Sequence, residues 1–316
     1  MRDPEVVIPL CGIHTSGTSP LSGTASNAVT TYDVASFPLT LFFLSWYDEI
    51  MFKRYVVFSV FLIFLFPARV FASSQTAYQE YLIEYDAYRA VLTDFKVARS
   101  EYIKYKTLTS QQTALDKTKQ MLSARSQLLY GYLQFLNEKL NESTAMNGTT
   151  KSLYQTLIAN ETQFLKNHIG LMGSIGSLQD AEGVSQKLIS HYTLLQSSIY
   201  QTIVGLKMSE MSALDTQYFD LFTKSYELIQ THRSSYTQEK QSILDRWLLQ
   251  IQNKRDLYKQ KTDEITKENA TLKSSSVSEI SAKYQRIIKL MSEARQYLIE
   301  GASFLQELTL SMQSGE

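Results

Sequence analysis

Residues 280–312, ISAKYQRIIKLMSEARQYLIEGASFLQELTLSM, decide the fold class of this chain. Alternating steps of four and three residues fall on non-polar positions throughout, at Ile280, Tyr284, Ile287, Met291, Ala294, Leu298, Gly301, Leu305, Leu308 and Met312. This heptad pattern is typical of a long helix that packs along its length against another helix. The partner helix is supplied within the chain or by a second copy. We therefore expect an association seam formed by Ile280, Ile287, Met291, Leu298 and Leu305.

The segment before this stretch carries a narrower apolar ladder, with one residue in every seven from Leu244 to Leu272. Residues 273–277 (KSSSV) separate the two segments, and Ser276 or Ser278 provides an N-cap for the second. Two long helices joined by a short turn form an antiparallel hairpin, so the last third of the chain predicts one.

A second hairpin is predicted near the start of the helical region. A tyrosine-rich segment, 76–109, precedes a leucine-rich segment, 113–142, and the polar residues 109–112 form the turn between them. The a/d spacing of the tyrosines indicates that they pack between helices. The glycines Gly131 and Gly301 lie inside the second helix of each hairpin, where we expect them to allow close helix approach.

The middle of the chain predicts two more helices. A shorter one spans about 152–169, and a long one spans about 179–232 with an expected break near 209–212. The apolar ladder of the long segment ends in Leu214, Tyr218, Leu221 and Leu228. Taken together, the segments predict an all-α fold of long antiparallel hairpins that form an elongated bundle or coiled coil.

The N-terminal part has a different character. Residues 51–72 (MFKRYVVFSVFLIFLFPARVFA) have two basic residues, an apolar run from Val56 to Phe66, and a small-residue cleavage site between Ala72 and Ser73. This order is that of a signal peptide, and the apolar run is shorter than the roughly 20 residues that span a bilayer. The alternative is an uncleaved N-terminal anchor. The sequence therefore predicts export across a membrane, to a secreted, periplasmic or cell-surface location.

Residues 1–50 show neither helical nor strand periodicity and carry four of the five prolines. We interpret them as an over-extended start, with Met51 as the initiator, or as a disordered leader. The domain organisation predicted from sequence is therefore 1–50, then a signal peptide or anchor at 51–72, then a helical domain at 73–316.

The composition weakens several classes of function. Lys and Arg (31) balance Asp and Glu (31), which gives no basic surface for bulk nucleic-acid binding. The single cysteine, Cys11, precedes the helical domain, and His168, His191 and His232 lack the spacing of zinc ligands. No motif of a nucleophilic hydrolase or a phosphate-binding loop occurs. We therefore expect no enzymatic activity, cofactor or metal.

Residues 169–178 (IGLMGSIGSL) form an uncharged, glycine-rich apolar stretch in the middle of the helical region. An export signal, long helices and a central apolar segment give an architecture similar to that of pore-forming helical toxins. The residues proposed for membrane or partner contact are Ile169, Leu171, Met172, Ile175 and Leu178. The alternative, a buried turn between helices, is favoured because ten residues are too few to span a bilayer.

The favoured function is that of an exported, non-enzymatic structural or interaction protein of the cell envelope or extracellular space. Its partner is another protein or a second copy of the chain, bound through helical seams. The second hypothesis is a membrane-active or lipid-associating protein that uses residues 169–178. Membrane contact through an N-terminal anchor is compatible with either hypothesis.

Overall fold

The computed structural model describes residues 72–274 and 276–313. All of the described residues belong to one compact unit. The predictions for residues 1–50 and for 51–71 therefore lie outside the described residues. Within the described ranges there is no β-strand, and the prediction of an all-α fold of packed helices is confirmed.

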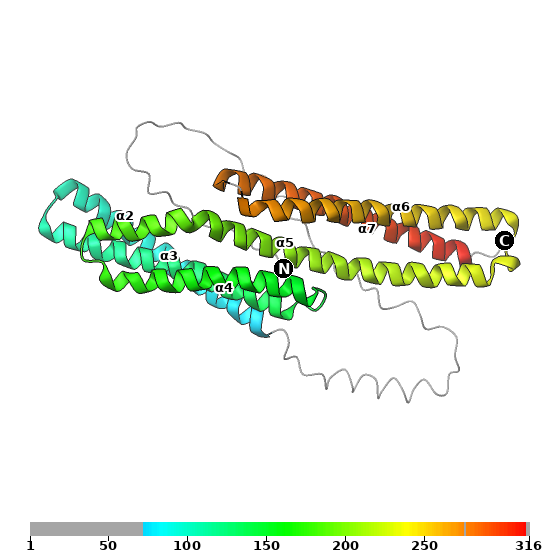
Figure 1. Cartoon of the computed structure of the whole chain (residues 1–316), viewed down its shortest axis with the longest axis horizontal. Coiled ribbons are helices and arrows are strands. Elements are labelled where there is room, and N and C mark those ends of the chain that lie inside the picture. Colours follow the sequence, from blue (N-terminus) through cyan, green and yellow to red (C-terminus); the bar gives the residue numbers. More distant parts are fainter. Residues whose placement is uncertain (1–71, 275, 314–316) are drawn as a thin grey trace, which may run out of the picture. The chain divides into compact units, whose positions relative to one another are not determined.

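Six α-helices account for most of the described residues (Figure 1). They are α2 (Ala72–Tyr105), α3 (Leu108–Glu142), α4 (Gly148–Gly170), α5 (Leu178–Thr231), α6 (Gln238–Thr271) and α7 (Val277–Gln313). Short 3-10 turns follow α4, α5 and α6, at η1 (Leu171–Ser174), η2 (Arg233–Ser235) and η3 (Leu272–Ser274). Four helices start at a side-chain N-cap, namely Thr107, Asn147, Ser177 and Thr237.

The helices α2 and α3 form the first hairpin. Lys117 pairs with Asp94 at 2.8 Å near the turn. At the other end, Ser74 Oγ donates to Glu142 Oε2 at 2.6 Å. These contacts join the start of α2 to the end of α3, as an antiparallel pair requires.

The turn of this hairpin lies earlier than the sequence predicts. It falls at Lys106 and Thr107, and residues 109–112 belong to the first turns of α3. Thr107 and Ser110 form a capping box, in which each side chain accepts from the backbone N–H of the other. The polar cluster that predicted a turn is therefore the cap and beginning of a helix.

The helix α5 packs against both hairpins, so it joins two groups of helices (Figure 1). It contacts α3 and α4 as well as α6 and α7. It is one continuous helix of 54 residues, so the predicted break at 209–212 is wrong. Of the predicted ladder residues in this half of α5, Tyr218 is buried, whereas Leu214, Leu221 and Leu228 are exposed. Met211 and Ile229 are also buried there.

The helices α6 and α7 form the second hairpin, also antiparallel. Lys254 pairs with Glu300 at 2.6 Å, and Lys261 pairs with Glu293 at 2.9 Å. Each partly exposed pair contributes at most about 1 kcal/mol, but both fix the same register between the helices. The apolar core of this region combines residues of α5, α6 and α7.

Candidate functional site

The apolar segment 169–178 is a turn whose large apolar side chains are buried or partly buried, while its glycines and serines are exposed. Met172 is 9% exposed and Ile175 is 3% exposed, and both belong to a core cluster with residues of α2 and α3. Leu171 and Leu178 pack against the same cluster, and Ile169 is partly buried. The structure thus brings the five predicted residues together in a turn that links α4 to α5.

Polar contacts hold this turn in place. Lys119 Nζ donates to the carbonyl oxygen of Ile175 at 3.1 Å. Ser177 caps α5, and the Asp180 carboxylate accepts from the backbone N–H of Gly176 at 3.1 Å. A hydrogen bond between the Ser177 side chain and the Asp180 carboxylate lowers the pKa of Asp180 most, and the N–H of Gly176 adds to this effect. No helix in the described part of the chain is long and apolar enough to cross a membrane.

The association seam on α7 faces the interior of the chain. Ile280 and Ile287 are fully buried, and Met291, Leu298 and Leu305 are each less than a tenth exposed. All five belong to the core cluster shared by α5, α6 and α7. Their partner helices in the structure are therefore supplied within the chain.

The predicted cleavage site, Ala72 and Ser73, lies at the first residues of α2. The Ser73 hydroxyl donates to the carboxylate of Glu138, and the backbone N–H of Ser74 donates to Glu142 Oε1 at 2.9 Å. The first N–H groups of a helix have no acceptor within that helix, and here carboxylates from the C-terminal turns of α3 accept from the start of α2.

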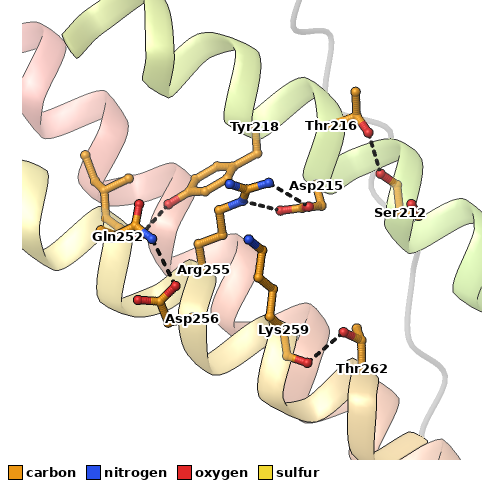
Figure 2. Close-up of polar contacts among 10 residues, drawn as sticks. Ser212, Asp215, Thr216, Tyr218, Gln252, Arg255, Asp256, Lys259 and Thr262 are labelled. Carbon is orange, nitrogen blue, oxygen red and sulfur yellow. Dashed lines mark hydrogen bonds and ion pairs between the residues drawn. The ribbon is translucent and has the colours of Figure 1, made fainter. Parts of the chain in front are cut away.

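A buried polar link joins α5 to α6 (Figure 2). Arg255 donates to both carboxylate oxygens of Asp215, at 2.9 and 3.2 Å, and its guanidinium lies 3.6 Å from the ring centroid of Phe219. Beside it, the Tyr218 hydroxyl donates to the carbonyl oxygen of Ile251 at 2.9 Å. Burial raises the pKa of Tyr218 well above its ordinary value and the pKa of Tyr258 to about 12.

These groups are arranged for structure and not for proton transfer. The Asp215 carboxylate is occupied by two N–H donors, and burial keeps the neighbouring phenol protonated. A bidentate Arg–carboxylate pair fixes geometry as well as charge, so the cluster sets the register between α5 and α6.

A second polar cluster lies between α4 and α5. The Glu161 carboxylate contacts His191 Nε2 at 2.7 Å and accepts from the Ser198 hydroxyl at 3.1 Å. The His191 ring stacks on Phe164 with centroids 3.6 Å apart. Because Ser198 donates to the carboxylate and not to an imidazole, this Ser–Glu–His set lacks the base-to-nucleophile contact of a hydrolase.

The buried His168 joins three helices. Its Nε2 lies 2.9 Å from the carbonyl oxygen of Val184, which can only accept, so this nitrogen carries the proton. Its Nδ1 lies 2.9 Å from the Ser126 hydroxyl. Burial lowers the pKa of His168, and nearby Arg125 adds to this effect. Sequence reasoning treated this histidine as an ordinary one, and its role is to connect α3, α4 and α5.

An open groove of about 520 Å³ lies between α2, α3 and α4. Its lining residues are Glu80, Glu84, Gln127, Tyr130, Gly131, Gln134, Lys166 and Ile169. Among the described residues, no three His, Cys, Asp or Glu side chains come together in a way that could hold a metal ion.

The turn of the first hairpin carries three exposed apolar side chains next to lysines. We call residues 102–108 (YIKYKTL) the hairpin tip. Leu108 is 82% exposed, Ile103 59% and Tyr105 58%. Sequence reasoning missed this site because no apolar run marks it, and the signal that could have found it is the alternation of apolar residues with Lys104 and Lys106.

Comparisons with known proteins give no match to a family model, a curated protein or a solved structure.

Proposed function

We propose that the chain is an exported, non-enzymatic helical scaffold of the cell envelope or extracellular space that binds a protein partner. The observation that carries this proposal is α5, a single 54-residue helix packed against both hairpins. A continuous helix of this length spans about 80 Å at 1.5 Å per residue. It can hold two surfaces at a fixed separation, which is the mechanical task of a scaffold.

Side-chain contacts tie both halves of α5 to their neighbours. The half near α4 is held by the contacts of Glu161 with His191 and Ser198. The other half is held by the pair of Asp215 with Arg255. Between them, Tyr200 of α5 stacks on Tyr284 of α7 with ring centroids 4.1 Å apart. These links along the helix support a rigid role for α5.

The proposal includes two finer features of the fold. The first is that α6 and α7 form an antiparallel coiled coil, supported by the heptad seam of α7 and the ion pairs across the hairpin. The second is cleavage of a signal peptide after Ala72. The carboxylates of Glu138 and Glu142 beside Ser73 and Ser74 support it, since they would face the new ammonium group.

The partner is proposed to be another protein or a second copy of the chain. Because the α7 seam is buried, self-association through it requires the second hairpin to open and exchange helices. The alternative function, membrane activity through residues 169–178, has less support, because Met172 and Ile175 pack in the core. Exposing that segment would expose part of the core between α2, α3 and η1.

The rigidity of α5 can be measured in the full chain by electron paramagnetic resonance. Spin labels at Gln186→Cys and Lys224→Cys, with Cys11→Ser, lie on exposed positions of α5 about 57 Å apart along the helix axis. We expect one narrow distance distribution near that value. A broad or shorter distribution would show that α5 bends near 209–212 and would refute the scaffold.

Export is tested separately by mass spectrometry of the native protein. A mature N-terminus at Ser73 in an extracytoplasmic fraction is the expected result. Retention of the chain inside the cell, or a native peptide from residues 5–45, would contradict the proposed processing.

A further inference from the structure

The hairpin tip projects beyond the rest of its helical group. The turn between α4 and α5 contacts α3 at Lys119 and Met121, where Lys119 Nζ donates to Ile175 O. From there α3 continues for about three turns, roughly 16 Å, to its start at Leu108. Figure 1 shows the turn between α2 and α3 as the free end of this hairpin. The tip is therefore accessible to a flat surface.

The tip also carries a local positive charge in a chain that is neutral in total. From residue 96 to residue 108 the basic side chains are Lys96, Arg99, Lys104 and Lys106, and the only acidic one is Glu101. All five are exposed. The next acidic residue on α2, Asp94, is paired with Lys117. The charge complements an anionic surface.

The backbone places a lysine where helices usually end in glycine. Lys106 has φ of 48° and donates its N–H to the carbonyl oxygen of Tyr102 at 2.9 Å, which ends α2 in a left-handed cap. A lysine in this conformation is strained relative to glycine. The lysine at this position adds an exposed charge to the tip.

We propose that the hairpin tip docks on an anionic lipid surface. The exposed side chains of Ile103, Tyr105 and Leu108 enter the interfacial layer, and Lys104 and Lys106 contact lipid phosphates. Short apolar segments flanked by lysines bind membranes in this way, and each basic residue near such a surface strengthens binding about fivefold. This site differs from residues 169–178 and goes beyond the scaffold proposed above.

A local probe tests the proposal in the full chain. In a Cys11→Ser background, an environment-sensitive fluorophore is attached at Thr109→Cys, which is exposed next to the tip. The control probe is placed at Thr149→Cys. Thr149 is also an exposed threonine at the second position of a helix, in this case α4. It follows the C-terminal end of α3, whereas the tip lies at the N-terminal end of α3. Because each probe reports on its own surroundings, membrane attachment through another part of the chain does not mimic tip insertion.

We expect vesicles of phosphatidylcholine with phosphatidylglycerol to shift the emission of the Thr109→Cys probe to the blue and to leave the Thr149→Cys probe unchanged. The double substitution Lys104→Gln with Lys106→Gln should raise the lipid concentration needed for half of the blue shift roughly 25-fold. The matched control, Lys259→Gln with Lys267→Gln, makes the same change of charge at exposed positions on α6 and should have no effect. Leu108→Gln should reduce the maximum blue shift.

Three outcomes would overturn the proposal. The first is no shift of the tip probe with the anionic vesicles. The second is an equal shift with vesicles of phosphatidylcholine alone, which would remove the role of the lysines. The third is a response only to added envelope protein and not to vesicles, which would assign the tip to a protein partner.

Discussion

Gly301→Ala tests how tightly α5 and α7 fit together. A Cβ atom at Gly301 would lie 2.5 Å from the hydroxyl oxygen of Tyr218 and 2.9 Å from Cζ of the same ring. Real Cβ contacts essentially never fall below 3.0 Å. The ring cannot move freely, because it is 7% exposed and its hydroxyl donates to Ile251 O. The methyl group therefore has to displace a buried, hydrogen-bonded side chain.

The free energy of unfolding follows from three opposing effects. Replacing glycine by alanine inside a helix gains about 1 kcal/mol. Overpacking a core costs about 1 to 3 kcal/mol, and leaving the buried Tyr218 hydroxyl without its acceptor, the Ile251 carbonyl oxygen, costs about 1 to 3 kcal/mol more. The net prediction is destabilisation by about 1 to 5 kcal/mol. In a chain of this size each kcal/mol lowers the melting temperature by roughly 2 to 4 °C.

Urea unfolding followed by circular dichroism measures this effect, and Gly131→Ala is the matched control. A Cβ at Gly131 would lie 3.8 Å from Cα of Tyr81, an ordinary contact, so this substitution should stabilise by about 0.5 to 1 kcal/mol. In a Tyr218→Phe background, Gly301→Ala should be less destabilising, because the closest contact is gone. If Gly301→Ala stabilised the chain as Gly131→Ala does, the inferred packing of α5 against α7 would be wrong.

Two further predictions concern charge. Asp215→Ala leaves the mostly buried Arg255 without its partner and should cost about 2 to 4 kcal/mol in urea unfolding. Asp245→Ala, which breaks the exposed pair with Arg233, should cost much less. Equal losses would contradict the burial of the first pair. Because burial lowers the pKa of His168 below its unfolded value of 6.5, the unfolded chain binds more protons between the two pKa values. The contribution of His168 to the free energy of unfolding should therefore be fully present above about pH 6.5 and should decrease as the pH falls below that value. Urea midpoints measured from about pH 7.5 to about 5.5 give this dependence, and His168→Gln should weaken it. An unchanged pH profile in that variant would exclude the neutral buried imidazole.

The longest apolar patterns in the sequence predicted the fold correctly. The seam of α7 repeats over its whole length, and its residues from Ile280 to Leu308 lie in the core of the hairpin. The heptad spacing depends on residues close in sequence, which is why sequence alone reveals it. The start of α4 was placed less well, because Asn147 caps a helix that begins at Gly148, whereas the sequence predicted a start at about 152.

The position of the first turn could not be read in the same way. The helix α2 ends at a lysine with positive φ, whereas the sequence cue for such an end is glycine or asparagine. Residues 109–112 have turn-forming composition, but Thr107 and Ser110 use that chemistry to start a helix. The same residue types serve caps and turns, so composition does not distinguish them.

The ladder along α5 was misread for a geometric reason. A straight α-helix drifts by about 20° per heptad relative to a seven-residue repeat, so a strict ladder leaves the buried face after several heptads. The helix also changes neighbours along its length, from α3 and α4 to α6 and α7. Leu195 lies in the core of the first region, whereas Leu221 is exposed in the second. The buried face of a helix that packs against two groups depends on which helices lie beside it at each point. The sequence of α5 alone does not reveal these neighbours.

Hydropathy and exposure are different quantities, and in this chain they single out different segments. Residues 169–178 have no charge and attract attention as a membrane segment, yet their large apolar side chains fill the space between α2, α3 and α5. Residues 102–108 interleave their apolar side chains with lysines and so have no marked hydropathy, but the hairpin turn exposes Ile103 and Leu108 together. A water-exposed apolar group gains free energy when it leaves water, and a buried one has already gained it. Any contact of the described helices with a lipid surface is therefore expected at the tip and not at the most apolar stretch.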